Sequence, residues 1–284
     1  MDLDTSIVLI IYNRPFLTRQ VVDAIKGVQP SRLFVIADGP KNGEDKILCD
    51  QARAIVEALE PIMKVEKRYN VSNVGCAENI VSGLNWVFDH VDRAIILEDD
   101  CVPHPSFFQY CEELLLKYEA NDEVMHISGC NLLGKISEDE DYFFSKHILP
   151  PWGWATWKRA WKNFNPELDT WQKSKKKIHS NIQFEHFKSW TDRFEFIRKN
   201  KVTWDLPWNV DIWANEGVGI VPSKNLVRNI GFGKEATFTK SPVSKFSEQD
   251  VYEIKFPMKH PVDRLFRNDK KLENAFVELM KEIG

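Results

Sequence analysis

Short strand-like segments alternate with amphipathic helical segments up to residue 130, and this alternation constrains the fold more than any other feature of the sequence. Most of the strand-like segments are uninterrupted apolar runs rich in β-branched residues, which is typical of strands buried on both faces of a parallel sheet. The predicted strands are residues 7–11, 33–37, 65–69, 93–97 and 125–129, and the predicted helices are residues 18–28, 47–59, 77–87 and 106–118. Because the connections are short, we predict an α/β fold with an open, mostly parallel sheet, right-handed crossovers and helices on both faces.

The second half of the chain has a different character. Residues 134–145 are acidic and loop-like, nine of the ten Trp lie between residues 152 and 213, and a last helix is predicted at 272–283. The chain has 284 residues and 43% of them are hydrophobic, which is enough to bury one large core. We therefore predict one continuous domain with an α/β half at 1–130 and a Trp-rich half at 131–284 that ends in a loop and a helix.

Charge and cysteine content exclude several classes of protein. The formal net charge is −4, so the chain lacks the basic character of a nucleic-acid-binding protein. The five Cys are odd in number and irregularly spaced, which argues against a disulfide framework or a zinc site. The run Lys173–Lys177 is typical of a solvated helix face or loop, and its alternative role is to attract an acidic acceptor or a membrane surface.

The start of the chain and its hydropathy predict a location. The segment MDLDTS lacks the charged and apolar regions of a signal peptide, and no apolar run approaches the ~20 residues that a transmembrane helix needs. We expect a cytoplasmic protein, with peripheral contact at the inner face of the membrane as the one membrane association that the sequence leaves open.

Polar side chains follow three of the predicted strands at the points where the strands end. Asn13 and Arg14 follow the first strand, Asp38 follows the second, and Glu98, Asp99 and Asp100 follow the fourth. Ligands of open α/β sheets bind at the carboxyl ends of the strands, so these side chains are expected to face one ligand site.

Glu98, Asp99 and Asp100 place three adjacent carboxylates at the end of a buried strand. Their mutual repulsion and their desolvation call for a compensating charge, and a hard cation such as Mg²⁺ or Mn²⁺ is the natural one. Because successive side chains of an extended segment point to opposite sides, we assign Asp100 to the metal, Asp99 to a ribose or a metal-bound water, and Glu98 to backbone or a basic neighbour. The alternative is an acidic turn that caps the helix beginning near Ser106.

Three further residues are candidates for binding a nucleotide. Arg14 can form a forked contact with a phosphate or stack on a base, and its alternative is a surface arginine. Asp38 can accept the N3–H of uracil, and its alternative is a turn residue before Gly39. Asn79, in the predicted helix 77–87, joins them as a candidate for contact with the nucleotide-sugar.

The Trp-rich half contains candidates for acid–base chemistry. Asp205 lies between Trp204 and Trp208, and an apolar surrounding raises the pKa of an Asp, which suits a general base. Asp211 is a second candidate for the base, and a capping or salt-bridged Asp is the structural alternative for both.

Indole faces can stack on sugars, so Trp154, Trp204 and Trp208 are candidates for a sugar platform, with core packing as their alternative. His260, in a loop flanked by prolines, is a candidate for a further metal ligand.

At these residues the sequence resembles glycosyltransferases of the GT-A fold. More narrowly, it is similar to the Golgi N-acetylglucosaminyltransferase that initiates complex N-glycans and to its bacterial relatives. The resemblance rests on Arg14, Asp38, the segment Leu97–Asp100, Gly153–Trp161 and Trp204–Trp208, in that order along the chain. Leu206 stands where the animal motif has a second acidic residue, which leaves the base open between Asp205 and Asp211.

The resemblance implies an inverting, metal-dependent transfer from a UDP-sugar, with GlcNAc or another hexose or N-acetylhexosamine moved to a glycan or lipid-linked acceptor. It implies a nucleotide-sugar-binding half at 1–130 and an acceptor-side half at 131–284, and a bacterial enzyme of polysaccharide biosynthesis fits best. One alternative is a sugar nucleotidyltransferase, which would need a Gly-rich phosphate-binding loop where Asn13-Arg14-Pro15 stands. The other is a non-catalytic carbohydrate-binding protein.

Overall fold

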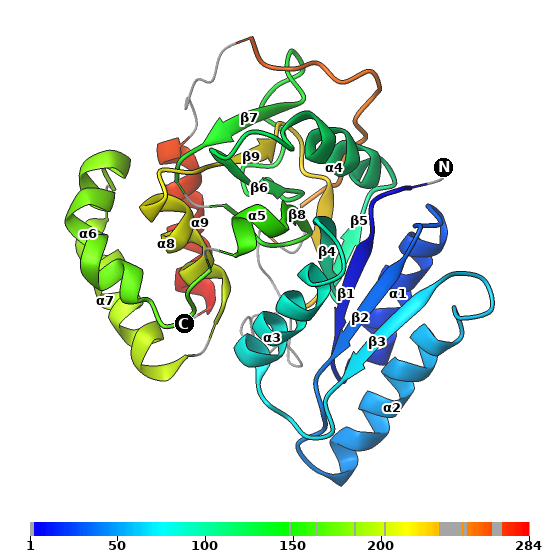
Figure 1. Cartoon of the computed structure of the whole chain (residues 1–284). Helices are drawn as coiled ribbons and strands as arrows, with labels where there is room; N and C mark the ends of the chain where they lie inside the picture. Colours follow the sequence, from blue (N-terminus) through cyan, green and yellow to red (C-terminus); the bar gives the residue numbers. More distant parts are fainter. Residues whose placement is uncertain are drawn as a thin grey trace.

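One eight-stranded sheet runs through the molecule and carries helices on both faces (Figure 1). The structure is a computed structural model that describes residues 3–147, 149–162, 164–184, 186–201, 203–232, 246, 249–262 and 269–283. In order across the sheet, the strands are β3 (Val65–Tyr69), β2 (Leu33–Ala37), β1 (Ile7–Ile11), β4 (Arg93–Glu98), β8 (Trp154–Trp157), β6 (Val124–Ser128), β9 (Val218–Pro222) and β7 (Tyr142–Ser145). The predicted α/β class, with a mostly parallel sheet flanked by helices, is confirmed.

The first four strands form the parallel part of the sheet. β3, β2, β1 and β4 pair in parallel, as strands joined by helical crossovers do. β8 then lies antiparallel between β4 and β6, β6 pairs in parallel with β9, and β7 closes the sheet antiparallel to β9. A separate two-stranded pair joins β5 (Cys101–Pro103) to β10 (Val227–Asn229). Strands from both sides of residue 130 thus share one sheet, while the division into two functional halves stays a prediction.

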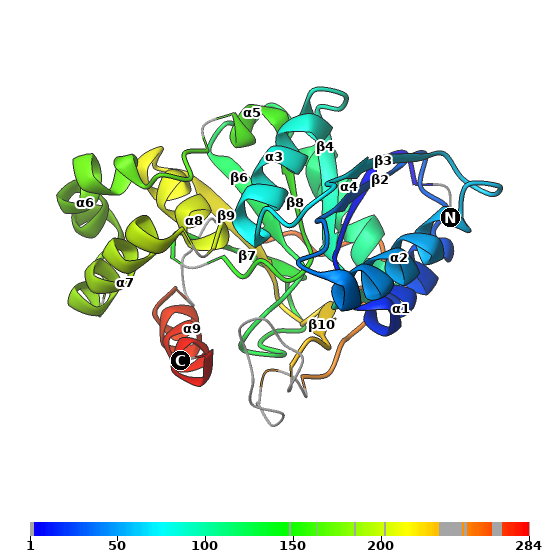
Figure 2. The ribbon, with the colours of Figure 1, turned by 90° about the horizontal axis from the view of Figure 1, so that it is seen from below.

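Alternate side chains of the buried strands enter two separate cores. In β1, Ile7, Leu9 and Ile11 face one side and Val8 and Ile10 face the other, as the period of a strand requires. The first side is covered by α1 (Pro15–Lys26), α2 (Gly43–Glu57) and α4 (Ser106–Lys117), and the second by α3 (Cys76–Phe88), α5 (Lys158–Trp161) and α8 (Asp205–Ala214). Figure 2 shows α1 and α2 below the sheet and α3 above it.

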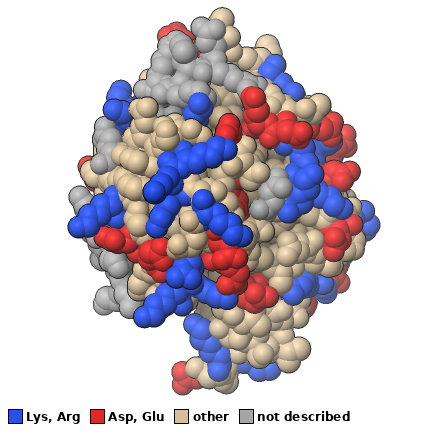
Figure 3. All heavy atoms as spheres, turned by 60° about the vertical axis from the view of Figure 1, so that its left-hand side comes forward, with Lys and Arg blue, Asp and Glu red and all other residues tan. Residues whose placement is uncertain are grey.

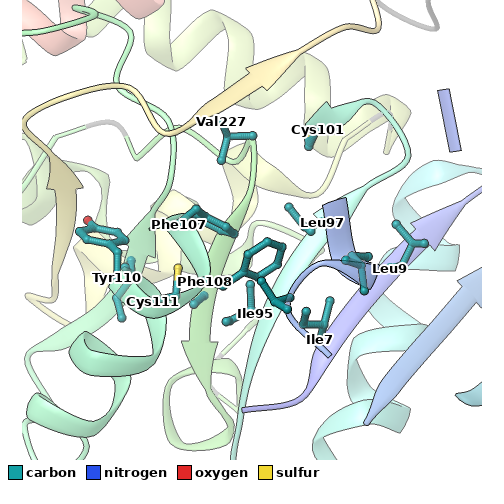
Figure 4. Packing of buried hydrophobic residues seen from close by; sticks show 14 of the residues in the cluster. Ile7, Leu9, Ile95, Leu97, Cys101, Phe107, Phe108, Tyr110, Cys111 and Val227 are labelled. Atoms are coloured by element: carbon teal, nitrogen blue, oxygen red, sulfur yellow. The ribbon is translucent and has the colours of Figure 1, made fainter. Parts of the chain in front are cut away.

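Large aromatic side chains fill the core between α4 and the sheet. Phe107 and Phe108 of α4 are fully buried and lie over Ile95 and Leu97 of β4 (Figure 4). The rings of the two phenylalanines contact each other edge to face, with 5.5 Å between their centroids. This packing fixes β4, and with it the acidic residues that follow the strand.

A third core lies away from the sheet, between helices of the second half. α6 (Asp169–Ile182), α7 (Phe187–Asn200), α8 and α9 (Asp269–Ile283) pack around Trp171, Trp190, Phe194, Trp213 and Phe276. The indole N–H of Trp190 donates a hydrogen bond of 3.0 Å to the buried carboxylate of Glu273 in α9. This cluster holds α7 and α8 as one unit.

The predicted strands match the observed ones to within one residue, whereas α1, α2 and α9 begin three or four residues earlier than predicted. α1 begins at Pro15, because proline has no N–H to leave unpaired and is favoured in the first helical turn. α2 begins at Gly43, because the side chain of Asn42 caps it by accepting a hydrogen bond from the Asp45 N–H. No helix among the described residues has both the length and the apolar character to cross a membrane.

Gly83 lets α3 approach β2 closely, and a methyl group there should destabilise the fold. A Cβ at this position would lie 2.5 Å from Ile36 of β2, so Gly83→Ala should lower the free energy of unfolding by about 1–3 kcal/mol, measured by chemical denaturation. Gly43→Ala is the matched control, because no atom lies within 4 Å of its Cβ, and it should leave stability unchanged or slightly raised. Equal stability of the two variants would contradict the packing described here.

Candidate active site

A cavity of about 420 Å³ opens at the carboxyl ends of β1, β2 and β4. One wall consists of residues at or just beyond these strand ends. A second wall comes from α7, from the segment that leads into α8 and from the first residues of α8. The residues of the first wall include Arg14, Asp38, Asn79, Glu98, Asp99 and Asp100, and those of the second include Arg193, Phe196, Thr203, Trp204 and Asp205. The position is the one where open α/β sheets bind ligands.

Arg14 lies between Asp99 and Asp100 and forms an ion pair with each. Its Nη1 is 2.8 Å from the Asp100 Oδ2, and its Nη2 donates a short hydrogen bond to the Asp99 Oδ1. Burial lowers the pKa of Arg14, but the attraction of Asp100 and Asp99 outweighs burial and raises it above the usual value. Arg14 therefore supplies the positive charge that the acidic cluster needs, instead of projecting freely toward a phosphate.

Glu98 is the member of the acidic cluster that Arg14 does not contact. Burial and the repulsion of Asp100 raise the pKa of Glu98 to about 8. No described residue donates a hydrogen bond to its carboxylate, which lines the cavity next to Asp100. Asp100 in turn lies against Gly231, where a Cβ would come within 2.1 Å of its Oδ2. The carboxyl groups of Glu98 and Asp100 would therefore be stabilised by a further positive charge.

Asp38 has its hydrogen bonds made within the protein. Its carboxylate accepts from the N–H groups of Gly39, Val74 and Gly75 at 2.8–3.0 Å and from the Asn73 side chain at 2.8 Å. These bonds hold the loop that leads from β3 into α3. A uracil at this position would have to replace one of them, so the direct role of Asp38 in this structure is to shape the cavity wall.

Asn79 lies next to this loop on the first turn of α3. It is 3% exposed, and its Oδ1 accepts a hydrogen bond of 2.9 Å from the Asn70 side chain. The side chain still lines the cavity, so Asn79 keeps its position beside the candidate nucleotide site.

Asp205 is the first residue of α8 and lines the second wall of the cavity. Burial raises the pKa of its carboxyl, while hydrogen bonds from Thr203 and from the backbone N–H of Leu206, together with the charge of Arg193, act in the opposite direction. A carboxyl group with a raised pKa that faces a cavity has the properties of a general base.

The three candidate tryptophans pack beneath Asp205 and are at most 3% exposed. Trp154 stacks on Trp204 with 5.1 Å between ring centroids, and the Trp208 Nε1 donates a hydrogen bond of 3.2 Å to the Nδ1 of His126. Burial lowers the pKa of His126 to about 3, so this imidazole stays neutral and able to accept. Only Trp204 of the three lines the cavity, while Trp154 and Trp208 pack behind the cavity lining.

Asp211 and His260 lie outside the cavity lining. Asp211 is 1% exposed and accepts a hydrogen bond of 2.5 Å from the Asn165 N–H, and burial raises its pKa to about 6. His260 contacts the hydroxyl of Tyr142 at 3.1 Å and the carboxylate of Glu113 at 3.5 Å. Asp205 and Asp211 thus differ in access to the cavity, which the sequence leaves open.

Sequence reasoning missed several residues that shape the cavity. Among them, Arg193 and Phe196 come from α7, and Gly231 accommodates Asp100. The segment 187–200 carries helical spacing but no motif, so its pattern gives no signal that one turn of it faces a ligand site. Only the packing of α7 against α8 brings Arg193 and Phe196 to the cavity.

A divalent cation fits this site only together with ligands from a substrate. Among the residues that the structure describes, no set of three or more His, Cys, Asp or Glu side chains is arranged to hold a metal ion. Mg²⁺ and related ions are commonly bound by one or two carboxylates plus the phosphates of a substrate, and Asp100 with Glu98 beside it matches that smaller donor set.

Comparisons with known proteins give remote likenesses only. No protein-family model matches the chain, and no curated protein matches its sequence. A mannosyltransferase from Pyrobaculum calidifontis, solved with GDP-Man and Mn²⁺, matches with 15% identity and a TM-score of 0.39 over 55% of this chain and 45% of that one. The chain thus spans less than half the length of that enzyme.

Two solved structures of another kind match at similar levels. A UDP-glucose pyrophosphorylase solved with UDP-glucose matches with 10% identity and a TM-score of 0.41, over 80% of this chain and 93% of that one. An inositol-1-phosphate CTP transferase from T. maritima matches with 9% identity and a TM-score of 0.36, over 56% and 73%. Likenesses at this level assign neither a family nor an activity to the chain.

Asp38→Asn should destabilise the protein whichever way the new amide is oriented. Each carboxylate oxygen of Asp38 accepts at least two hydrogen bonds, so an NH₂ group in place of either oxygen leaves two donors unpaired. The expected loss is about 2–4 kcal/mol in the free energy of unfolding, measured by urea denaturation. Asp23→Asn, at a side chain that is 60% exposed, is the control and should change stability by less than about 0.5 kcal/mol. A similarly small effect at Asp38 would argue that its hydrogen bonds do not hold the loop.

Proposed function

We propose that the protein is a glycosyltransferase that takes its sugar from a nucleoside diphosphate-sugar, and that transfer takes place in the cavity between the strand ends and α8. The observation that carries this proposal is the presence, in one cavity, of an acidic cluster beside Arg14 and of a separate, half-buried carboxyl with a raised pKa at Asp205. Sugar transfer needs both functions, since one group must support the leaving diphosphate and another must accept the proton of the attacking hydroxyl. The volume of about 420 Å³ lies within the range of small-molecule sites.

The donor occupies the wall formed by the strand ends. Asp100, with Glu98 beside it, would hold Mn²⁺ or Mg²⁺ together with the diphosphate, and a bound cation would supply charge stabilisation for the leaving nucleoside diphosphate. Asp99 holds Arg14 in place and is available to a ribose hydroxyl. We take the donor to be a UDP-sugar, with GlcNAc or another hexose or N-acetylhexosamine as the sugar, because the motif resemblance favours it.

The acceptor approaches from the side of α7 and α8. Asp205 accepts the proton of an acceptor hydroxyl while the oxygen forms a bond to the anomeric carbon and the bond from that carbon to the diphosphate breaks. A single displacement of this kind inverts the configuration of the sugar. Burial keeps the pKa of Asp205 above that of an ordinary Asp, which makes the carboxylate a stronger base.

A sugar nucleotidyltransferase is the second candidate, because it would also use a nucleotide and a metal at the strand ends. The two reactions differ in their products. With a UDP-sugar, Mn²⁺ and a saccharide acceptor, a glycosyltransferase releases UDP, whereas a nucleotidyltransferase converts the UDP-sugar and pyrophosphate into UTP and a sugar phosphate. Chromatography of the nucleotides separates the two, and UTP formed only with pyrophosphate would replace the present proposal.

Asp205→Asn should abolish sugar transfer, whereas Asp211→Asn should leave it largely intact. Loss of a general base typically lowers turnover about 10²–10⁴-fold, and only Asp205 lines the cavity. For the unmodified enzyme, kcat/KM should rise with pH through a pKa above that of an ordinary Asp, because the base acts in its ionised form. UDP release at saturating donor measures both effects. A large loss in Asp211→Asn with retained activity in Asp205→Asn would reverse the assignment.

Asp100→Asn should weaken the binding of UDP in the presence of Mn²⁺. It removes one of the two carboxylates assigned to the cation, so affinity measured by calorimetry should fall by roughly tenfold or more, while metal-free binding changes less. Gly231→Ala should act in the same direction, because its methyl group would displace the Asp100 carboxylate. Asp23→Asn is the control. Unchanged Mn²⁺-dependent affinity in Asp100→Asn would remove Asp100 from the metal site.

A further inference from the structure

Three positively charged side chains line the described part of the cavity, and they differ in their partners. Arg14 is held by Asp99 and Asp100. Lys41 lies over the ring of Tyr12, 5.6 Å from its centroid. Arg193 of α7 has neither a hydrogen-bond acceptor nor an ion-pair partner among the described residues. Burial lowers the pKa of Arg193, as expected for a guanidinium that is partly desolvated without a contacting anion.

Arg193 belongs to the same wall as Asp205 but does not contact it. The two side chains attract each other electrostatically, while no nitrogen of Arg193 comes within 4 Å of a carboxylate oxygen among the described residues. The guanidinium is therefore free to contact a ligand that reaches Asp205. Since the donor is assigned to the strand ends, that ligand is the acceptor.

Phe196 lies one helical turn beyond Arg193 and lines the same cavity. Its side chain is 59% exposed, whereas Trp190 and Phe194 of the same helix are at most 3% exposed. An exposed phenyl ring beside a guanidinium at a cavity offers an apolar face for the C–H groups of a saccharide and a donor fork for an oxyanion.

The surrounding helices favour an anionic ligand as well. The sequence from 169 to 201, which covers α6 and α7, contains nine Lys or Arg and four Asp or Glu, although the whole chain has a net charge of −4. Figure 3, in which the α6–α7 side of the molecule comes forward, shows groups of Lys and Arg side chains on this face with Asp and Glu beside them. Positive charge near a cavity raises the association rate of anions.

We infer that Arg193 and Phe196 form the acceptor subsite, and that the acceptor is a saccharide that carries an anionic group, either a carboxylate or a phosphate. Phe196 stacks on the sugar ring, and Arg193 binds the oxyanion through its fork of N–H donors. This inference rests on the proposed function, because Asp205 defines which wall the acceptor approaches. It assigns acceptor specificity to α7.

The test compares three sugars that differ only at carbon 6: methyl β-glucoside, methyl β-glucuronide and methyl β-glucoside 6-phosphate. Their binding to the full chain is measured by saturation-transfer NMR titration, with and without UDP and Mn²⁺. We expect at least one anionic sugar to bind about tenfold more tightly than the neutral one, because only an anionic sugar can form a charge-assisted bidentate contact with Arg193. The glucuronide and the phosphate arms tell which oxyanion is preferred.

Arg193→Gln should remove the preference for the anionic sugar and leave UDP affinity within about twofold. Phe196→Ala should weaken the binding of all three sugars to the same extent. Arg198→Gln is the matched control, because Arg198 lies on the same helix, pairs with Glu195 at 3.2 Å and does not line the cavity. This control should keep both the preference and the UDP affinity.

Three results would overturn the inference: no preference for an anion in the unmodified protein, a preference that survives Arg193→Gln, or a loss of UDP affinity in Arg193→Gln, which would place Arg193 on the donor. Failure of the proposed function has a different signature. The unmodified protein would then release no UDP from a UDP-sugar with a saccharide acceptor, while the sugar titrations without UDP would still report on Arg193 and Phe196.

Discussion

The ion pairs of Arg14 with Asp99 and Asp100 are the interaction on which the rest of the site depends. Three carboxyl groups at the end of a buried strand repel one another and lose hydration, so they need positive charge within contact distance. Arg14 meets this need for two of them. Glu98 has no cationic contact among the described residues, and its pKa is raised by burial and by the negative charge of Asp100. A cation bound with a diphosphate would offset this negative charge, which links the electrostatics of the fold to the proposed donor.

The sheet register brings these charges together. β1 pairs in parallel with β4 so that Ile10 lies opposite Glu98, and the residues that follow each strand emerge side by side. The Tyr12 N–H donates to Asp99 at 3.3 Å, and Arg14 follows at the start of α1. β8 and α8 then position the second wall, because Trp154 of β8 supports Trp204 next to Asp205. The two walls of the cavity, which we propose hold the donor and the acceptor, thus come from separate parts of the chain.

The sequence predicts the parallel half of the fold well, because its strands are continuous apolar runs with turn residues at their ends. It does not predict β8, since the sequence offers Trp154 only as part of a sugar platform or of the core, and the strand is evident only from its pairing between β4 and β6. The same limit applies to side chains. The position of Asp38 is predictable from its strand, but three donors to its carboxylate, from Asn73, Val74 and Gly75, come from a distant loop and depend on the folded chain. Arg193 has no motif around it, and its place beside Asp205 follows from helix packing alone.

The most direct measurement of the central claim is a crystal structure with a UDP-sugar and Mn²⁺, in which anomalous scattering locates the metal. The account predicts a manganese peak bound by Asp100 and the diphosphate, and an anomeric carbon that faces the carboxylate of Asp205 across the cavity. A nucleotide bound elsewhere, or a sugar with its anomeric carbon directed away from Asp205, would contradict it.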